Sequence, residues 1–260
     1  MTRQNYKITI KSGSLSFIIS PDSQAHLISH DGFFAPDLDV KLSSYASSHG
    51  CYPTKQSYGV RLLSLTAEII GETDEARRRL TKMLTPEREC TITTEFDGVS
   101  RKINVIPYGE VRFTPHYFTS ALEFELTFAA PGIFFEDAET KSPAYDKDTA
   151  SVSINNIGDV PCGLVVTIKA NGGNVTTPGI KYGSQYVRCP TTLKNGSTLV
   201  IDTRERNKKI TLGGTKYYGF DSGSTFFSVP TGNSKVTVTA NSGLEYVDAS
   251  VSFTPLYLGI

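Results

Sequence analysis

Leu122-Glu123-Phe124-Glu125-Leu126-Thr127-Phe128 is the stretch that decides the fold class. Apolar and polar residues alternate at every position of this segment. Successive side chains of a β-strand point to opposite faces, so a period of two gathers the four apolar residues on one face and the polar residues on the other. The segment therefore predicts a half-buried strand.

The same alternation recurs near the end of the chain, where Val247, Ala249, Val251 and Phe253 alternate with Asp248, Ser250 and Ser252. Thr, Val, Ile, Phe and Tyr are plentiful. Gly or Pro interrupts the chain about every eight to twelve residues, which is the turn spacing of sandwiches and barrels. We expect an all-β protein, mainly β with one short helix.

A β-hairpin is expected over residues 91–105. Asp97-Gly98 supplies the positive φ angles of a tight turn between two strand-like runs, residues 91–96 and 101–105.

The short helix is expected at about residues 74–84. Thr73 can cap it, and the acidic residues Asp74 and Glu75 suit its positive N-terminal end. Pro86 would stop it. The expected apolar stripe consists of Ala76, Leu80, Met83 and Leu84.

Two domains are the first expectation for 260 residues, because single domains usually hold roughly 100 to 200. The segment from Glu136 to Pro143 is polar and contains a proline, as an exposed linker would. We place the boundary near residue 140. The predicted domains are two β-sandwiches: residues 1–139, which also hold the helix and the hairpin, and residues 140–260.

Charge and cysteine usage exclude several classes of protein. Basic and acidic residues number 26 each, so no charge imbalance points to nucleic acid or a membrane surface. Residues 1–20 lack the apolar run of a secretory signal, and no apolar stretch reaches the roughly 20 residues of a membrane helix. We expect a soluble protein whose four widely separated cysteines, Cys51, Cys90, Cys162 and Cys189, are reduced.

The segment Asp221-Ser222-Gly223-Ser224 matches the short signature around an aspartic protease carboxylate. Such proteases need two aspartates that share one proton, and the chain has one copy of the motif. The preferred interpretation is a polar turn that joins two strands, Gly219-Phe220 and residues 225–227.

Two further clusters admit a catalytic or metal-binding interpretation. Glu123 and Glu125 would share one strand face about 6 to 7 Å apart, a spacing that overlaps the carboxylate pairs of glycosidases. A solvated strand face explains them more simply. His26 and His30, beside Asp31, would form half of a metal site if that segment were helical, but no further ligands can be identified.

Three other patterns are interpreted as ordinary surface structure. Gly213-Gly214 lacks the spacing of a phosphate-binding loop and indicates a turn. Arg77, Arg78 and Arg79 spread around a helix and cannot form one base-reading stripe. The charged run from Arg204 to Lys209 is expected to be a hairpin tip.

A carbohydrate-binding module or adhesin is the alternative from another class of function. Sugar sites usually present a flat aromatic ring, and the chain has no tryptophan. Tyr182, Tyr186, Tyr217 and Tyr218 are the residues that could stack on a sugar instead. An enzyme built around Asp221 or the Glu123–Glu125 pair is a third hypothesis. We expect a structural protein that is not an enzyme, with no catalytic, cofactor-binding or metal-binding residues.

Several segments, taken in order, resemble the distal tail protein family of long, non-contractile-tailed phages. In the first half these are residues 49–52, 58–65 and 69–71, the expected helix with Pro86, the Asp97-Gly98 hairpin, and residues 124–131. In the second half they are residues 154–161, 199–203 and 229–238. The chain departs from the family after residue 131, where Gly132-Ile133-Phe134-Phe135 replaces the usual Asp-Pro-Tyr.

The resemblance implies a fold and a role. The N-terminal domains would form a homohexameric ring in the virion tail tip or baseplate, joining the tail tube protein to tail-tip and receptor-binding proteins, after assembly in the host cytoplasm. DNA would pass through the channel without specific binding, and no membrane would be involved. The C-terminal domain would be a galectin-like, jelly-roll sandwich, although the galectin sugar-contact tryptophan is missing.

Overall fold

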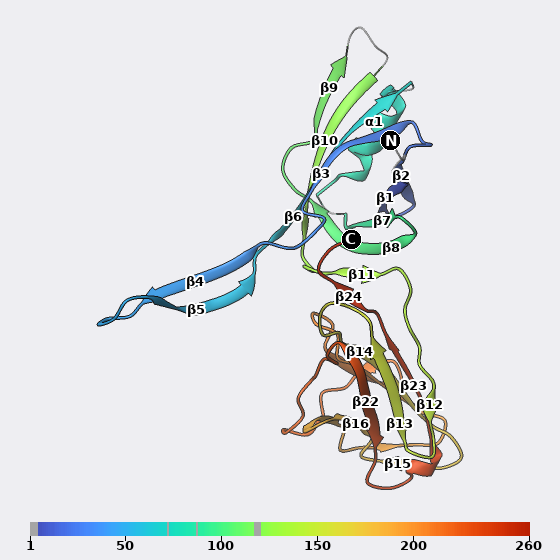
Figure 1. Cartoon of the computed structure of the whole chain (residues 1–260). Helices are drawn as coiled ribbons and strands as arrows, with labels where there is room; N and C mark the ends of the chain where they lie inside the picture. Colours follow the sequence, from blue (N-terminus) through green and yellow to red (C-terminus); the bar gives the residue numbers. More distant parts are fainter. Residues whose placement is uncertain (1–4, 72, 87, 117–120) are drawn as a thin grey trace. The chain divides into compact units, whose positions relative to one another are not determined.

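The computed structural model describes residues 5–71, 73–86, 88–116 and 121–260. They form two compact units (Figure 1). Unit 1 comprises Met1–Ala138 and Tyr257–Ile260, and unit 2 comprises Glu139–Leu256. Strands dominate both, and α1 (Thr73–Met83) is the one α-helix within the described ranges, so the expected all-β fold is confirmed.

Unit 1 is built on one extended antiparallel sheet with the order β2-β1-β7-β8-β10-β6-β3. Three further strands join it: β9 beside β10, β11 beside β8, and β24 (Leu256–Tyr257) beside β11. The strands are β1 (Tyr6–Ser12), β2 (Leu15–Ile19), β3 (Ala25–Asp31), β6 (Arg61–Ile70), β7 (Cys90–Phe96), β8 (Val99–Pro107), β9 (Arg112–His116), β10 (Ala121–Ala130) and β11 (Phe135–Asp137).

The strand β8 connects the two halves of this sheet. It pairs with β7 across the expected Asp97-Gly98 turn, and its last residues reach β10, where Pro107 lies opposite Phe128. Along β10 the four alternating residues Leu122, Phe124, Leu126 and Phe128 are all buried, as the sequence predicts. They share one hydrophobic core with residues of β1 and β7 on the other half of the sheet.

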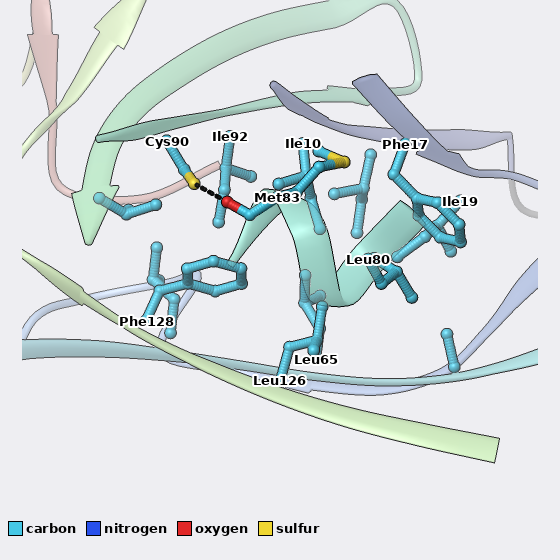
Figure 2. Packing of buried hydrophobic residues seen from close by; sticks show 14 of the residues in the cluster. Ile10, Phe17, Ile19, Leu65, Leu80, Met83, Cys90, Ile92, Leu126 and Phe128 are labelled. Atoms are coloured by element: carbon cyan, nitrogen blue, oxygen red, sulfur yellow. Dashed lines mark hydrogen bonds between the residues drawn. The ribbon is translucent and has the colours of Figure 1, made fainter. Parts of the chain in front are cut away.

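Helix α1 fills part of this core (Figure 2). Leu80 and Met83 are fully buried, while the polar residues of the helix remain at the surface. Around them lie Ile10, Ile92, Leu65, Leu126 and Phe128, from four different strands. The helix was expected at residues 74–84, and both of its observed ends lie one residue earlier. Leu84 follows the helix and is partly buried against the core.

The segment expected to be a linker is partly strand. Glu136 and Asp137 belong to β11 and pair with Lys102 and Arg101 of β8. The units separate between Ala138 and Glu139, and β24 (Leu256–Tyr257) leads the chain back into unit 1. Residues 257–260, assigned from the sequence to the second domain, therefore pack with the first. The sequence pattern could not predict that the chain end rejoins unit 1, because the four residues concerned are too few to show a periodicity.

Unit 2 is a β-sandwich. One sheet has the order β12-β13-β22-β16-β17 and the other β21-β20-β19-β14-β23, with β15 and β18 paired apart from both. The strands are β12 (Tyr145–Asp146), β13 (Ser151–Asn156), β14 (Leu164–Ala170), β15 (Val175–Thr176), β16 (Gly179–Tyr182), β17 (Gln185–Arg188), β18 (Thr192–Leu193), β19 (Thr198–Asp202), β20 (Lys209–Leu212), β21 (Thr215–Lys216), β22 (Gly232–Thr239) and β23 (Val247–Phe253), with a 3-10 turn, η1 (Leu244–Tyr246).

The two sheets of unit 2 share a single apolar core. Ile154 and Val236 contribute from the first sheet, and Val166, Ile201 and Val251 from the second. Side chains on the inner faces of two sheets interdigitate in this way in β-sandwiches. The alternation read at residues 247–253 is confirmed, since Val247, Val251 and Phe253 are buried in this core while Ala249 is partly exposed.

Candidate functional site

The protease-like motif is a turn in unit 2. Ser224 donates its backbone N–H to the carbonyl oxygen of Asp221 at 2.9 Å, and Gly223 donates to the Asp221 carboxylate at 3.2 Å. The expected flanking strands are wrong: residues 217–228 are irregular and lie against β17 through backbone bonds such as Thr225 N–H to Tyr186 O. The carboxylate of Asp221 faces Arg188 at 3.9 Å, so its neighbour is a cation and not a second acid.

The two glutamates of β10 lie on a polar strand face. Glu125 is exposed, and the carboxylate of Glu123 lies 3.6 Å from the imidazole of His116 on the neighbouring strand β9. This geometry matches the solvated strand face favoured by the sequence.

The two histidines lie on strand β3, so the helical arrangement that a metal site would need does not form. His30 packs among the rings of Phe33, Phe34 and Phe96, at centroid distances of 5.4, 5.5 and 6.0 Å. Burial lowers the pKa of His30, and the charge of Asp31 opposes that shift. Across the described ranges no group of three or more His, Cys, Asp or Glu residues is placed to hold a metal ion.

All four cysteines are free thiols, of which Cys51 is exposed and the other three are buried. Burial raises the pKa of Cys162 and of Cys189 to about 11. Buried, protonated thiols are poor nucleophiles because the thiolate is the reactive form.

The most distinctive surface is a long two-stranded hairpin, which we call the arm: β4 (Leu38–Ser44) and β5 (Cys51–Tyr58). It extends away from the rest of unit 1 (Figure 1). Within the described residues its strands pair with each other and with no further strand. An isolated two-stranded hairpin is at best marginally stable in water. The arm therefore lacks the packing that stabilises every other strand of the unit.

The two faces of the arm differ in polarity. Leu38, Val40 and Leu42 alternate along β4 and share one face, where Leu38 lies opposite Tyr58 and Leu42 opposite Pro53. A register shift beside Leu42 leaves Thr54 as an extra residue, which donates its hydroxyl to the carbonyl oxygen of Lys41. Leu38 and Leu42 are 72% and 60% exposed. Within the described residues of unit 1, the apolar face of the arm therefore has no partner.

The opposite face of the arm is charged. Lys55 donates a hydrogen bond to the carboxylate of Asp39 on the other strand, and the two form an ion pair. Lys41 lies directly opposite Lys55. Such a division is usual for a strand pair with one face against a partner and one in water. The alternation at residues 38–43 is present in the sequence, but no strand was predicted there. The matched segment at residues 49–52 proves to be the end of the arm.

Arg61 anchors the base of the arm. Its guanidinium is buried and donates to four backbone carbonyls, those of Gly32 at 3.0 Å, Ile133 at 2.6 Å, Leu258 at 2.6 Å and Phe34. It also lies 4.9 Å from the ring centre of Phe135. Burial lowers the pKa of Arg61 to about 10, which leaves it charged at neutral pH.

Gly32 makes this arrangement possible. Its φ of +77° lies in the left-handed region, and a Cβ atom at this position would sit 1.9 Å from the carbonyl oxygen of Leu62. Only glycine fits so close an approach of backbone to backbone. Arg61 and Gly32 together hold residues 32–34, which lead into β4, next to the start of β6, which follows β5.

The four tyrosines considered for sugar stacking occupy different environments in unit 2. Tyr182 and Tyr217 are partly buried against the core. Tyr186 lies beneath the guanidinium of Arg188, 4.7 Å from the ring centre. Tyr218 is 76% exposed and is the one ring of the four that is open to solvent.

The remaining sequence interpretations also have clear outcomes. Residues 204–208 form the tip between β19 and β20, and Gly213-Gly214 forms the turn between β20 and β21, both as expected. The three arginines of α1 are exposed. No helix in the described ranges has the length and hydrophobicity to span a membrane.

Comparisons with known proteins point to one class. Residues 157–257 match the family described as "Siphovirus-type tail component, C-terminal domain". The Dit protein (gp 19.1) of phage SPP1, described as a paradigm of hub adsorption apparatus in phages that infect Gram-positive bacteria, is similar in fold with a TM-score of 0.68 and 13% identity, over 96% of this chain and 98% of that one. Comparison with curated sequences gives no significant match.

Two chains from the phage p2 baseplate in its activated conformation have the same fold. The one solved with calcium gives a TM-score of 0.58 at 10% identity over 98% of each chain. The one solved with strontium gives 0.55 at 8% identity, over 96% of this chain and 97% of that one. At these identities the likeness is one of fold, and it extends through both units.

The C-terminal part of the chain, residues 157–257, is thus similar to a phage tail-component family, and the fold of the whole chain is that of phage hub and baseplate proteins. More narrowly, the recognition of the distal tail protein family made from the sequence is confirmed, with the family match itself carried by residues 157–257.

Proposed function

We propose that this chain forms a homohexameric ring through unit 1 and serves as the hub of a phage tail tip. The ring joins the tail tube to tail-tip and receptor-binding proteins, and DNA leaves through its channel. Unit 2, a galectin-like sandwich, lies outside the ring. The role is structural and non-enzymatic, and the protein assembles in the host cytoplasm before it is part of the virion. The fold shared with the SPP1 hub protein supports this proposal.

The arm is the observation that carries the proposal. Its apolar face has no partner within unit 1, and its strands form no sheet beyond their own pair in the described residues. Fully burying a side chain such as Leu38 or Leu42 contributes about 1.5–3 kcal/mol. A second copy of the chain is the partner that supplies such a surface to every arm in the assembly.

Arm and receiving surface are different parts of the chain, so the contact is head to tail. A head-to-tail contact closes into a ring when its rotation permits. The chain has a net charge of zero, which suits a conduit because phosphate contacts from Lys and Arg would retain DNA.

Native mass spectrometry of the full chain tests the ring. We expect a six-subunit species, formed by the chain alone or after addition of the tube protein. A double variant, Leu38→Ser with Leu42→Ser, should shift the population to monomers without lowering the melting temperature, because both side chains are exposed in the monomer. Lys41→Ser, on the charged face of the same strand, is the matched control and should keep the ring.

Two results would contradict the proposal. One is a strict monomer at high concentration even with the tube protein present. The other is a double variant that assembles as well as the wild type, because the apolar face of the arm would then have no part in the ring.

A further inference from the structure

A shallow groove in unit 2 has a lining unlike the rest of the chain. It holds about 240 Å³. Its lining combines three lysines with four aromatic rings and one isoleucine: Lys208, Lys209, Lys216, Tyr217, Tyr218, Phe220, Phe226 and Ile210. Among the described residues no carboxylate lines it. The zero net charge of the chain therefore conceals a locally basic and aromatic site.

The hairpin β20–β21 sets the outer wall of the groove. Thr211 lies opposite Lys216, and the backbone N–H of Tyr217 bonds to the carbonyl oxygen of Ile210 at 2.8 Å. Ile210 is buried, so Lys209 and Lys216 point to the outer face of the sheet, as diagonal neighbours about 7–8 Å apart. The two lysines therefore lie on the same face of the sheet.

The lysines of the groove keep their charge for an external partner. Within the described residues no ion pair involves Lys208, Lys209 or Lys216, and two neighbouring aspartates are each paired with an arginine. Asp202 is buried and bound by Arg204, and Asp221 faces Arg188. Asp202, the cross-strand partner of Lys209, is engaged by Arg204, which leaves the three lysines as the charged groups that line the groove.

The aromatic rings give the groove its floor and rim. Phe226 packs on the sandwich core and meets Phe220 edge to face at 6.1 Å, which fixes the orientation of both rings. Tyr218 is 76% exposed and Phe220 is 41% exposed. Ligand sites typically combine aromatic rings with a few placed polar groups, and this groove has both.

We propose that this groove binds an anionic saccharide, with a sugar ring stacked on Tyr218 and a carboxylate or phosphate held by Lys209 and Lys216. The volume suits one saccharide unit, with the rest of a polymer running over the open surface. Lysine is a point charge that suits carboxylate and phosphate alike. A neutral sugar would leave the ammonium groups unused, and an extended single-stranded nucleic acid needs a longer basic track with several stacked bases. The proposal is independent of the ring.

Isothermal titration of the full chain with four probes tests the assignment. Oligogalacturonate offers both a pyranose ring and carboxylates, a neutral galactan oligomer of equal length offers the ring alone, inorganic phosphate offers the charge alone, and oligo-dT tests nucleic acid. We expect binding of oligogalacturonate at least about tenfold tighter than that of the other three, and weakening as salt rises.

Point variants separate the two parts of the site. Tyr218→Ala should weaken oligogalacturonate binding about tenfold, and Tyr218→Phe should retain it, because stacking needs the ring and not the hydroxyl. Lys209→Gln with Lys216→Gln should abolish the preference over the neutral oligomer. Lys194→Gln, at an exposed lysine elsewhere in unit 2, is the control and should bind as the wild type does.

The proposal fails if the neutral oligomer binds as tightly as oligogalacturonate, or if Tyr218→Ala leaves the affinity unchanged. Tighter binding of oligo-dT would overturn it in favour of a nucleic-acid site. Saccharide binding can be measured whether the protein is a monomer or a ring. A failure of this proposal is therefore distinguishable from a failure of hexamer assembly.

Discussion

Replacement of Arg61 by methionine should destabilise unit 1 strongly. The guanidinium donates to four backbone carbonyls from three stretches of chain, at Gly32 and Phe34, at Ile133 and at Leu258. Methionine fills a similar volume but donates nothing. A buried acceptor left without a donor costs about 1 kcal/mol or more, so four of them give about 4 kcal/mol.

The loss should be visible as a lower melting temperature. For a unit of this size about 1 kcal/mol lowers the melting temperature by roughly 2–4 °C, which predicts a decrease of about 8–16 °C in scanning calorimetry. Hydrogen exchange supplies a local measurement. The amide of Ile260, bonded to the carbonyl of Phe33 at 3.1 Å, should lose protection because Arg61 holds both neighbouring segments.

Arg78→Met is the matched control, since Arg78 is exposed on α1 and should tolerate the change. If Arg61→Met melts with the wild type and keeps the Ile260 amide protected, the four-carbonyl anchor contributes nothing and the reasoning is refuted. A decrease of equal size in both variants would also refute it, because the effect would then follow from the lost charge alone.

Two further predictions concern titration and reactivity. Burial lowers the pKa of His30 in the folded state, so as pH falls through the ordinary histidine range the unfolded chain takes up a proton first and stability decreases. The difference in melting temperature between pH 7.5 and pH 5 should therefore shrink in His30→Phe, and an unchanged difference would contradict this. Cys51 should react with a thiol reagent in the native protein while the three buried cysteines react only after unfolding, so a count of one thiol before denaturant and four after it is expected, and Cys51→Ser should reduce the first count to zero.

The sequence predicted those parts of the fold that local chemistry determines. The alternation at residues 122–128 and the Asp97-Gly98 turn specify a strand and a hairpin without reference to distant residues, and the structure contains both as β10 and β7–β8. Helix α1 was found within one residue of its expected ends. The interpretation of Asp221 as part of a turn was right for the same reason, because Asx-type bonding is local.

The candidate interaction surfaces could be predicted only in part. The alternation of Leu38, Val40 and Leu42 indicates a strand, but a strand pattern cannot say that its apolar face has no partner within the unit. The flanks of Asp221 were expected to be strands because residues 225–227 have the composition of one. In the structure this segment lies beside β17 and forms only isolated backbone hydrogen bonds with it, so no regular strand pairing develops.

What the sequence alone determined is the all-β class, the helix, the turns and, through ordered resemblance, the family. Only the tertiary structure decided that Arg61 meets Leu258, 197 positions along the chain, that the last residues return to unit 1, and that three lysines and four rings share one groove. The reason is physical. Side-chain period and turn chemistry act over a few residues, whereas these contacts depend on which strands the whole chain brings side by side.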